Sequence, residues 1–290
     1  MGLFVIEDFT TSCGVRVPAL RVYYQTFGLP LGSAPVVVVN HAFTGNSEVA
    51  GEKGWWGAAI GDHKVIDTLK YTVIAFNIPG NGYMGTEADM ITNYQHWEAI
   101  DVARIFNYGL QEHFQLQQIF ALVGCSLGGG IAWEMAALAP ELFQHLVIVA
   151  ADWKAPDWII GNCLLQEQIL KNSNNPLHDA RLHAMLCYRT PLSLKMKFER
   201  TTHAVSQLYN VESWLLHHGE KLHKRFSLTA YKLMNQLVKT IDISRERGSF
   251  AAAVAPITAK LPSSARTLIC ILCHKKTAIR WLNCKNWVRR

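Results

Sequence analysis

No aspartate or glutamate follows Glu246, so all 22 acidic residues of the 290-residue chain lie at or before that position. From residue 248 to the end, eight lysines and arginines have no acidic residue among them. Residues 1–247 carry 20 basic and 22 acidic side chains, the balance of an ordinary cytosolic enzyme. The formal net charge of +6 therefore comes from the tail. We expect no nucleic-acid partner and no membrane partner from this charge pattern.

Other features are also missing. No apolar run reaches the roughly 20 residues of a membrane span, and the start, Met1 to Asp8, has acids where an export signal needs positive charge. The seven cysteines are odd in number and lack framework spacing, which indicates reduced thiols. No metal-ligand cluster, phosphate loop or dinucleotide fingerprint occurs. The sequence thus predicts a cytoplasmic protein without a bound metal or cofactor.

One motif does carry chemistry: Gly124-Cys125-Ser126-Leu127-Gly128 follows an apolar run over 118–123 and precedes a helix-like stretch ending before Pro140. This G-x-S-x-G spacing is typical of a nucleophile elbow, where a strand turns sharply into a helix and exposes a strained serine. A helix-capping serine among small residues is the alternative interpretation. The strand before the motif and the small residues after it favour the elbow, with Ser126 as nucleophile and Cys125 directed into packing.

A weak alcohol nucleophile also needs hydrogen-bond donors for the developing oxyanion. The β-branched run over 36–39 predicts a buried parallel strand ending near His41. In an elbow fold, the backbone N–H groups of Phe43 and of Leu127 would then face the oxyanion. His41 lies too early in the chain for the triad order serine, acid, histidine, so we interpret it as structural.

The fold class that follows is α/β: an α/β-hydrolase fold with a mostly parallel sheet flanked by helices and an inserted helical lid. We predict opening strands within 3–27, a strand over 71–76 and a helix over 98–114. The expected organisation is a first part of the core over 1–152, a helical lid over 153–244, and the end of the core with the basic tail over 245–290. Apolar lid residues either line a substrate channel or pack on the core: Met185, Met196, Trp214 and Leu215.

Two groups of motifs in this chain resemble those of one known family. The core motifs are 40–47 (NHAFTGNS), 54–56 (GWW), Asn77 with Gly80 and Gly85, and 124–129 (GCSLGG). The lid motifs are 188–190 (YRT), 211–215 (VESWL) through Gly219, Lys221, 225–226 (RF) and Tyr231. Over about residues 1–260 the chain resembles the homoserine O-acetyltransferase family, with a departure at His217-His218, which we expect to line the lid.

The resemblance implies a ping-pong acyl transfer from acetyl-CoA, through Ser126, to the hydroxyl of homoserine, in methionine biosynthesis. It further implies a homodimer, and it places Arg189 on the carboxylate of the amino-acid substrate, since a guanidinium bonds both oxygens. An exposed structural arginine is the alternative. Neither the elbow nor the lid fixes acetyl over succinyl, and a serine esterase or a non-catalytic relic remains open.

The family pattern also requires a late aspartate and a histidine near the C-terminus, and this chain has neither in place. A reading frame shifted near residue 262 would explain the loss. Read from the third base of each codon, residues 274–288 can encode Q-E-N-R-D-T-V-A-Q-L-Q-K-L-G, and 267–272 can encode S-D-L-Y-F. We predict a frame-shifted or truncated C-terminus and an inactive enzyme unless substitutes such as Asp152 and His274 act. The C-x-x-C-H pattern over 270–274 is then accidental.

Overall fold

The computed structural model describes residues 1–204 and 207–261. One sheet organises this part of the chain, with strand order β1-β2-β6-β3-β7-β8. The strands are β1 (Gly2–Thr10), β2 (Arg16–Gly28), β3 (Val36–Asn40), β6 (Thr72–Phe76), β7 (Ile119–Cys125) and β8 (Phe143–Val149). β1, β2 and β6 pair antiparallel, whereas β6, β3, β7 and β8 run parallel. The predicted α/β-hydrolase architecture is confirmed.

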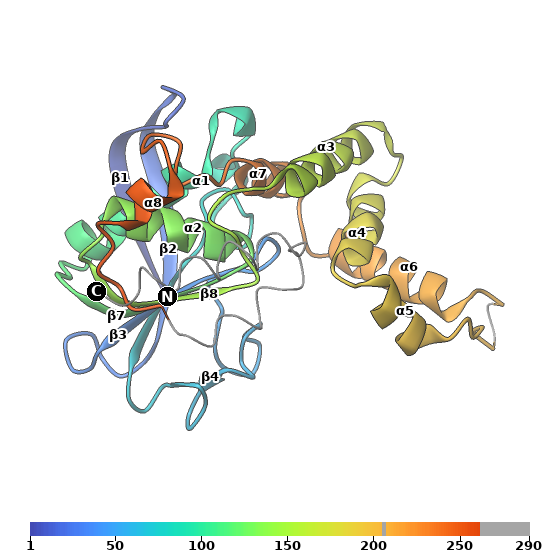
Figure 1. The fold of residues 1–290 in the computed structure, drawn as a ribbon, viewed down its shortest axis with the longest axis horizontal. Helices are drawn as coiled ribbons and strands as arrows, with labels where there is room; N and C mark the ends of the chain where they lie inside the picture. The colour runs from blue at the N-terminus through green and yellow to red at the C-terminus, as the bar shows by residue number, and fades with distance from the viewer. Residues whose placement is uncertain (205–206, 262–290) are drawn as a thin grey trace.

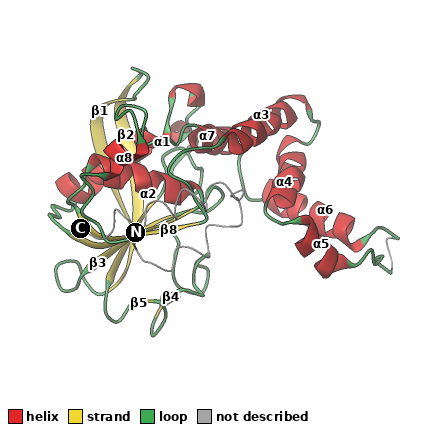
Figure 2. Cartoon of the chain, viewed as in Figure 1, coloured by secondary structure: helices red, strands yellow, loops and turns green. Residues whose placement is uncertain are grey.

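Valines that alternate between two cores build the centre of the sheet. Val36 and Val38 lie in the larger core, while Val37 and Val39 lie in the smaller one, because successive strand residues point to opposite faces. Helices α1 (Ala99–Tyr108), α2 (Leu127–Leu138) and α8 (Phe250–Val254) cover the larger core. On the opposite side the segment with β4 (Ile60–Gly61) and β5 (Ile66–Asp67) covers the smaller core (Figure 2). Both faces of a parallel sheet are thereby buried.

The predicted elements of the first half are confirmed with small changes at their ends. The opening hairpin turns where Gly14 donates its N–H to the Thr11 carbonyl, at 2.9 Å. The helix expected over 98–114 forms as α1 and then widens into a π-helical turn, Gly109–His113. Short 3-10 turns at Glu87–Asp89 and Tyr94–His96 precede it.

After β8 the chain becomes helical, as predicted for the lid. The lid helices are α3 (Asp157–Asn172), α4 (Pro176–Cys187), α5 (Pro191–Phe198), α6 (Asn210–His223) and α7 (Leu228–Lys239). A short polar segment, residues 173–175, lies between α3 and α4. Figure 1 shows α3 to α6 extending from the core as an arm, whereas α7 returns to it.

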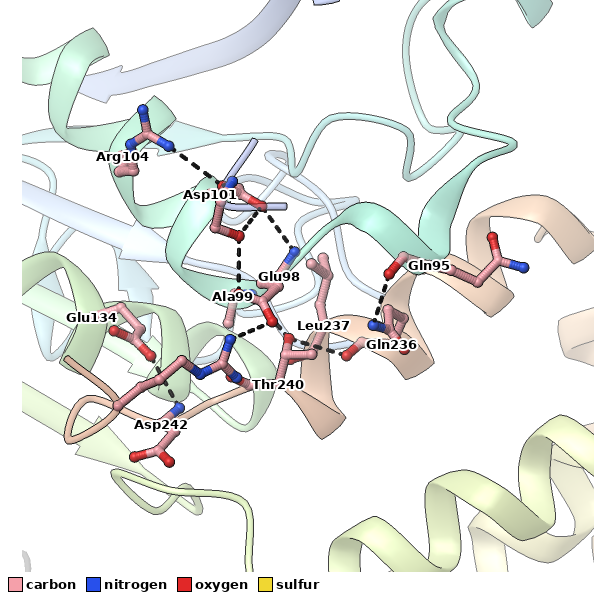
Figure 3. A network of polar contacts seen from close by, with 12 residues as sticks. Gln95, Glu98, Ala99, Asp101, Arg104, Glu134, Gln236, Leu237, Thr240 and Asp242 are labelled. Atoms are coloured by element: carbon pink, nitrogen blue, oxygen red, sulfur yellow. Dashed lines mark hydrogen bonds and ion pairs between the residues drawn. The ribbon is translucent and has the colours of Figure 1, made fainter. Parts of the chain in front are cut away.

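Polar contacts join the end of the lid, where the chain returns to the core, to helices α1 and α2 (Figure 3). The Ala99 N–H donates to Thr240 Oγ1 at 3.0 Å, and the Asp242 N–H donates to Glu134 Oε1 at 3.0 Å. Arg245 forms an ion pair with Glu98 beside them. Because the partners belong to segments more than 100 residues apart, these bonds fix the end of the lid relative to the core.

The last described residues re-enter the sheet beyond β8. Lys260 forms a parallel bridge to His145, donating its N–H to the Gln144 carbonyl at 2.8 Å. Its own carbonyl accepts the Leu146 N–H at 3.0 Å. Lys260 is therefore paired in parallel with the outer side of β8 by a single bridge.

Candidate active site

Ser126 occupies the junction between β7 and α2 with φ 53° and ψ −122°. A positive φ is uncommon for a residue with a side chain and indicates local strain, which persists only where the surroundings impose it. The surroundings here are hydrogen bonds: the Ser126 N–H donates to the Val149 carbonyl at 2.9 Å. The Ser126 carbonyl accepts the N–H groups of Gly129 and Gly130 at 2.8 and 3.0 Å. The serine is therefore held in the sharp turn that the G-x-S-x-G spacing predicts.

Glycines flank this turn because no side chain fits there. A Cβ on Gly124 would lie closer than 3.0 Å to the backbone of Gly128. A Cβ on Gly128 would lie equally close to the carbonyl oxygens of Asn40 and His41 at the end of β3. The first turn of α2 thus rests directly on the backbone that leads into the 41–45 turn.

That close approach brings the two predicted oxyanion donors to the same edge of the sheet. β3 pairs with β7, with Asn40 opposite Gly124. The turn that holds Phe43 and the turn that begins α2 at Leu127 therefore follow neighbouring strands at the same edge of the sheet. Leu127 is the first residue of α2, and an N–H at that position has no acceptor within its own helix. Their joint role in binding an oxyanion stays a prediction.

His41 is buried, and both of its ring nitrogens form hydrogen bonds. It is 1% exposed, and its Nε2 accepts the Ile78 N–H at 3.1 Å. The proton therefore sits on Nδ1, which donates to the Ala42 carbonyl at 2.8 Å. Burial lowers the pKa of His41 to about 4, so the ring is neutral at physiological pH. With both ring nitrogens used, His41 supports the loop, in agreement with the structural interpretation.

A small cavity opens beside Ser126 on the side of β8. Its apolar walls include Ala150, Ala155 and Ile159, and its polar groups are Asp152 and Lys154. Lys154 forms a 2.8 Å ion pair with Asp242, and Asp152 accepts the Trp153 N–H at 2.8 Å. No histidine of the described residues lines this cavity. The structure thus supplies a carboxylate near the serine, while the proposed partner His274 lies outside the described residues.

The lid contacts the 41–45 turn at two points that the sequence did not single out for this role. The Phe43 ring packs on the Tyr231 ring with centroids 4.7 Å apart, and the buried Tyr231 hydroxyl donates to Gln166 Oε1 at 3.0 Å. Arg225 donates to the Thr44 carbonyl at 3.1 Å. Both residues belong to the family motifs in the lid, but only the tertiary structure shows that they contact the loop.

Arg189 lies between α4 and α5 and does not line the cavity beside Ser126. Its guanidinium donates to Ser193 Oγ at 2.9 Å and stacks over the Trp214 ring at 5.6 Å. His217 and His218 lie on α6, where His218 contacts the same indole. The predicted contact of Arg189 with a substrate carboxylate therefore stays a prediction.

Cysteine chemistry is not favoured next to the serine. Burial raises the pKa of the Cys125 thiol, which keeps it protonated. In the described part of the chain, no group of three or more histidine, cysteine or acidic side chains is placed to hold a metal ion. There too, every helix is too short or too polar to cross a bilayer. The C-x-x-C-H pattern and the predicted frame shift fall outside the described residues.

Comparison with known proteins identifies the fold independently. Residues 35–175 match the family model described as alpha/beta hydrolase fold. A homoserine o-acetyltransferase structure from Staphylococcus aureus superimposes with a TM-score of 0.75 at 24% identity, over 90% of this chain and 77% of the other. Esterase E22 superimposes with a TM-score of 0.79 at 17% identity, over 98% and 90% of the two chains. These identities establish the fold alone.

Sequence similarity is closer to one group of acyltransferases. The homoserine O-acetyltransferase of Clavibacter michiganensis subsp. michiganensis is 32% identical in an alignment that covers 86% of this chain and 74% of the relative. That of Chloroherpeton thalassium is 29% identical over 83% of this chain and 69% of the relative. With its elbow serine, its β3 turn and its helical lid, the chain belongs to the homoserine O-acetyltransferase family, acyltransferases with the α/β-hydrolase fold.

Proposed function

We propose that this protein transfers an acetyl group from acetyl-CoA to the hydroxyl of homoserine through an acyl-enzyme on Ser126. The observation that carries the proposal is the strained serine at the β7–α2 junction, packed against the turn that holds Phe43. The two relatives compared above are named homoserine O-acetyltransferase, which supports the choice of donor and acceptor. Methionine biosynthesis in the cytoplasm is the setting that this reaction implies.

The reaction would proceed in two balanced halves. The Ser126 Oγ attacks the thioester carbonyl, its proton passes to a base, and the N–H groups of Phe43 and Leu127 stabilise the oxyanion. Collapse of that intermediate breaks the carbon–sulfur bond, and the base gives its proton to the leaving thiolate, which releases coenzyme A. The homoserine hydroxyl then attacks the acyl-serine and gives its proton to the same base. Collapse of this second intermediate breaks the ester bond to Ser126 Oγ, which takes the proton back, and O-acetylhomoserine is released.

The described residues do not supply an evident general base for Ser126. Among the described residues, His41 has both nitrogens engaged and no histidine lines the cavity. His274 is the one histidine after residue 223. General-base catalysis contributes on the order of 10²–10⁴ in rate, so we expect this chain to turn over slowly.

Acetyl transfer is tested by incubating the protein with acetyl-CoA and L-homoserine and measuring O-acetylhomoserine by mass spectrometry. Transfer that Ser126→Ala abolishes supports the proposal. Product formation that Ser126→Ala leaves unchanged would exclude Ser126 as the nucleophile.

A serine esterase is the second candidate, because esterase E22 superimposes over 98% of this chain. The two functions differ in whether water or an alcohol reaches the acyl-enzyme. Hydrolysis of 4-nitrophenyl acetate that homoserine neither accelerates nor diverts into O-acetylhomoserine would favour the esterase.

The arm formed by helices α3 to α6 also supports the homodimer that the resemblance implies. Several large apolar side chains on it face solvent, among them Trp158 (65% exposed), Leu192 (65%) and Met196 (72%). Exposed apolar area of this kind is typical of an association surface. We propose that a second copy covers it, which light scattering on the purified protein would test.

A further inference from the structure

The turn after β3, which holds one of the two predicted oxyanion donors, is fixed at both ends to the segment that follows β6. We call residues 41–47 the oxyanion turn. At its start, His41 Nε2 accepts the Ile78 N–H at 3.1 Å. At its end, the Ser47 N–H donates to Asn77 Oδ1 at 2.7 Å. The predicted donor lies between these two bonds, so they limit where its N–H can point.

Asn77 can hold the oxyanion turn because its own backbone is fixed. Its N–H donates to the Tyr23 carbonyl at 2.8 Å, which continues the antiparallel pairing of β6 with β2. The side chain is buried, and its Oδ1 also accepts Asn81 Nδ2 at 3.4 Å. The same Asn81 nitrogen lies 3.4 Å from His41 Nε2. The two ends of the oxyanion turn therefore share one buried polar cluster.

Among the contacts at the end of the oxyanion turn, the bond to Asn77 is the buried one. Gln25 Nε2 donates to Ser47 Oγ at 3.0 Å, but this bond is only partly buried. Trp55 Nε1 donates to the Asn46 carbonyl at 2.9 Å, and this bond is partly buried too. A buried N–H that loses its acceptor is destabilising by its full desolvation penalty. We therefore expect Asn77 Oδ1 to hold the turn more strongly than the other two contacts.

The amide nitrogen of Asn77 indicates that the acceptor oxygen is the part in use. Among the described residues, the buried Nδ2 has no hydrogen-bond partner. An unpaired buried N–H group is destabilising, so the stability of the fold alone does not account for an amide at this position. An apolar side chain of similar size would avoid that penalty, but it could not accept the Ser47 N–H.

We propose that Asn77 is a positioning residue for the acyl transfer. By accepting the Ser47 N–H, it holds the oxyanion turn so that the Phe43 N–H is directed at the oxyanion before substrate binds. Donors that are fixed in advance stabilise an oxyanion without reorganising in the transition state. The proposal rests on the proposed function, because this oxyanion forms only when Ser126 attacks an acyl group. Asn77 acts through Phe43 and needs no contact with the substrate.

Substitutions can separate the acceptor oxygen of Asn77 from the packing of its side chain. Asn77→Leu keeps a similar volume and removes the acceptor, whereas Asn77→Asp keeps an acceptor oxygen. Asn107→Leu is the matched control. Asn107 on α1 is also buried, its Nδ2 donates to the Met135 carbonyl at 3.0 Å, and its Oδ1 has no partner among the described residues. Gln25→Leu removes the partly buried contact to Ser47 Oγ and provides a second test if Asn77→Leu does not fold.

Hydrogen exchange followed by mass spectrometry measures the oxyanion turn without requiring turnover. We expect the peptide that spans residues 41–47 to exchange about ten- to hundredfold faster in Asn77→Leu and close to the wild-type rate in Asn77→Asp. Gln25→Leu should give a smaller increase in the same peptide, and Asn107→Leu should give none. Unchanged exchange in both Asn77→Leu and Gln25→Leu would overturn the proposal. Equal increases in Asn77→Leu and in either Asn77→Asp or Asn107→Leu would also overturn it.

Acetylation of Ser126 then connects the oxyanion turn to the reaction. Mass spectrometry of the intact protein gives the rate constant for acetylation and the half-saturating concentration of acetyl-CoA. We expect Asn77→Leu to lower the rate constant about ten- to hundredfold and to leave the half-saturating concentration unchanged, because the oxyanion forms only after binding. A change in the half-saturating concentration alone would overturn the positioning role. A wild type that is never acetylated on Ser126 would contradict the proposed function instead, while the exchange rates still decide whether Asn77 holds the turn.

Discussion

Replacing Glu134 by glutamine removes a buried ionisable group from the middle of α2. Glu134 is 1% exposed, its Oε1 accepts the Asp242 N–H, and its Oε2 has no hydrogen-bond partner (Figure 3). Burial raises the pKa of this carboxyl from 4.5 to about 7, with Arg247 and Arg245 opposing the shift. The folded protein therefore holds a proton on Glu134 that the unfolded chain has lost between pH 4.5 and 7.

This difference in proton binding decides how the stability of the protein changes with pH. Where the folded state binds more protons than the unfolded state, stability falls as pH rises. A shift from 4.5 to about 7 corresponds to about 3 kcal/mol of lost stability above pH 7, at 1.36 kcal/mol per pH unit. Glutamine keeps the acceptor for Asp242 but cannot ionise, so Glu134→Gln would not suffer this loss.

Thermal unfolding followed by circular dichroism at pH 5 and pH 8 measures the difference. We expect little change in Tm at pH 5 and a gain of about 5 °C at pH 8, from the entropy of unfolding of a chain of this size. Glu141→Gln, at an exposed position, is the control and should shift Tm equally at both pH values. A Tm difference for Glu134→Gln that does not grow with pH would refute the reasoning.

Three further predictions, two substitutions and one titration, follow from the contacts of the site. Gly128→Ala would place a Cβ closer than 3.0 Å to two carbonyl oxygens of the β3 end, and we expect about 1–3 kcal/mol of destabilisation in urea unfolding. His41, held neutral with a pKa of about 4, should show no ring-proton titration by NMR between about pH 5 and 8; a midpoint near 6.5 would contradict its burial. Tyr231→Phe leaves Gln166 Oε1 without its donor and should cost about 1–3 kcal/mol in the same unfolding measurement, whereas an unchanged midpoint would show that water replaces the hydroxyl.

Local sequence patterns were sufficient to predict the strands and turns that depend on neighbouring residues. The β-branched run of β3 has strong strand propensity, and the glycines around Ser126 reflect a turn that leaves no room for a Cβ. These two features were enough to predict the sheet and the elbow. The loss of the family pattern near residue 262 is likewise a property of the sequence, and it lies outside the described residues.

Contacts between distant segments could not be predicted in the same way. Arg225 contacts Thr44 across 181 residues, and Glu134 accepts the Asp242 N–H across 108 residues. Helical periodicity describes which residues share a face, but it does not state what that face will meet. The substrate contact of Arg189, which the motif match suggests, stays a prediction, and its guanidinium contacts Ser193 Oγ.

The most direct test of Ser126 catalysis compares two proteins made from the same gene. One carries the chain as printed, and the other reads the shifted frame from about residue 262. We expect acetyl transfer from acetyl-CoA to L-homoserine by the second protein, lost on Ser126→Ala, and at least about a hundredfold slower transfer by the first, in which no histidine of the described residues lines the cavity beside Ser126. No transfer by either protein, or equal transfer by both, would contradict this mechanism.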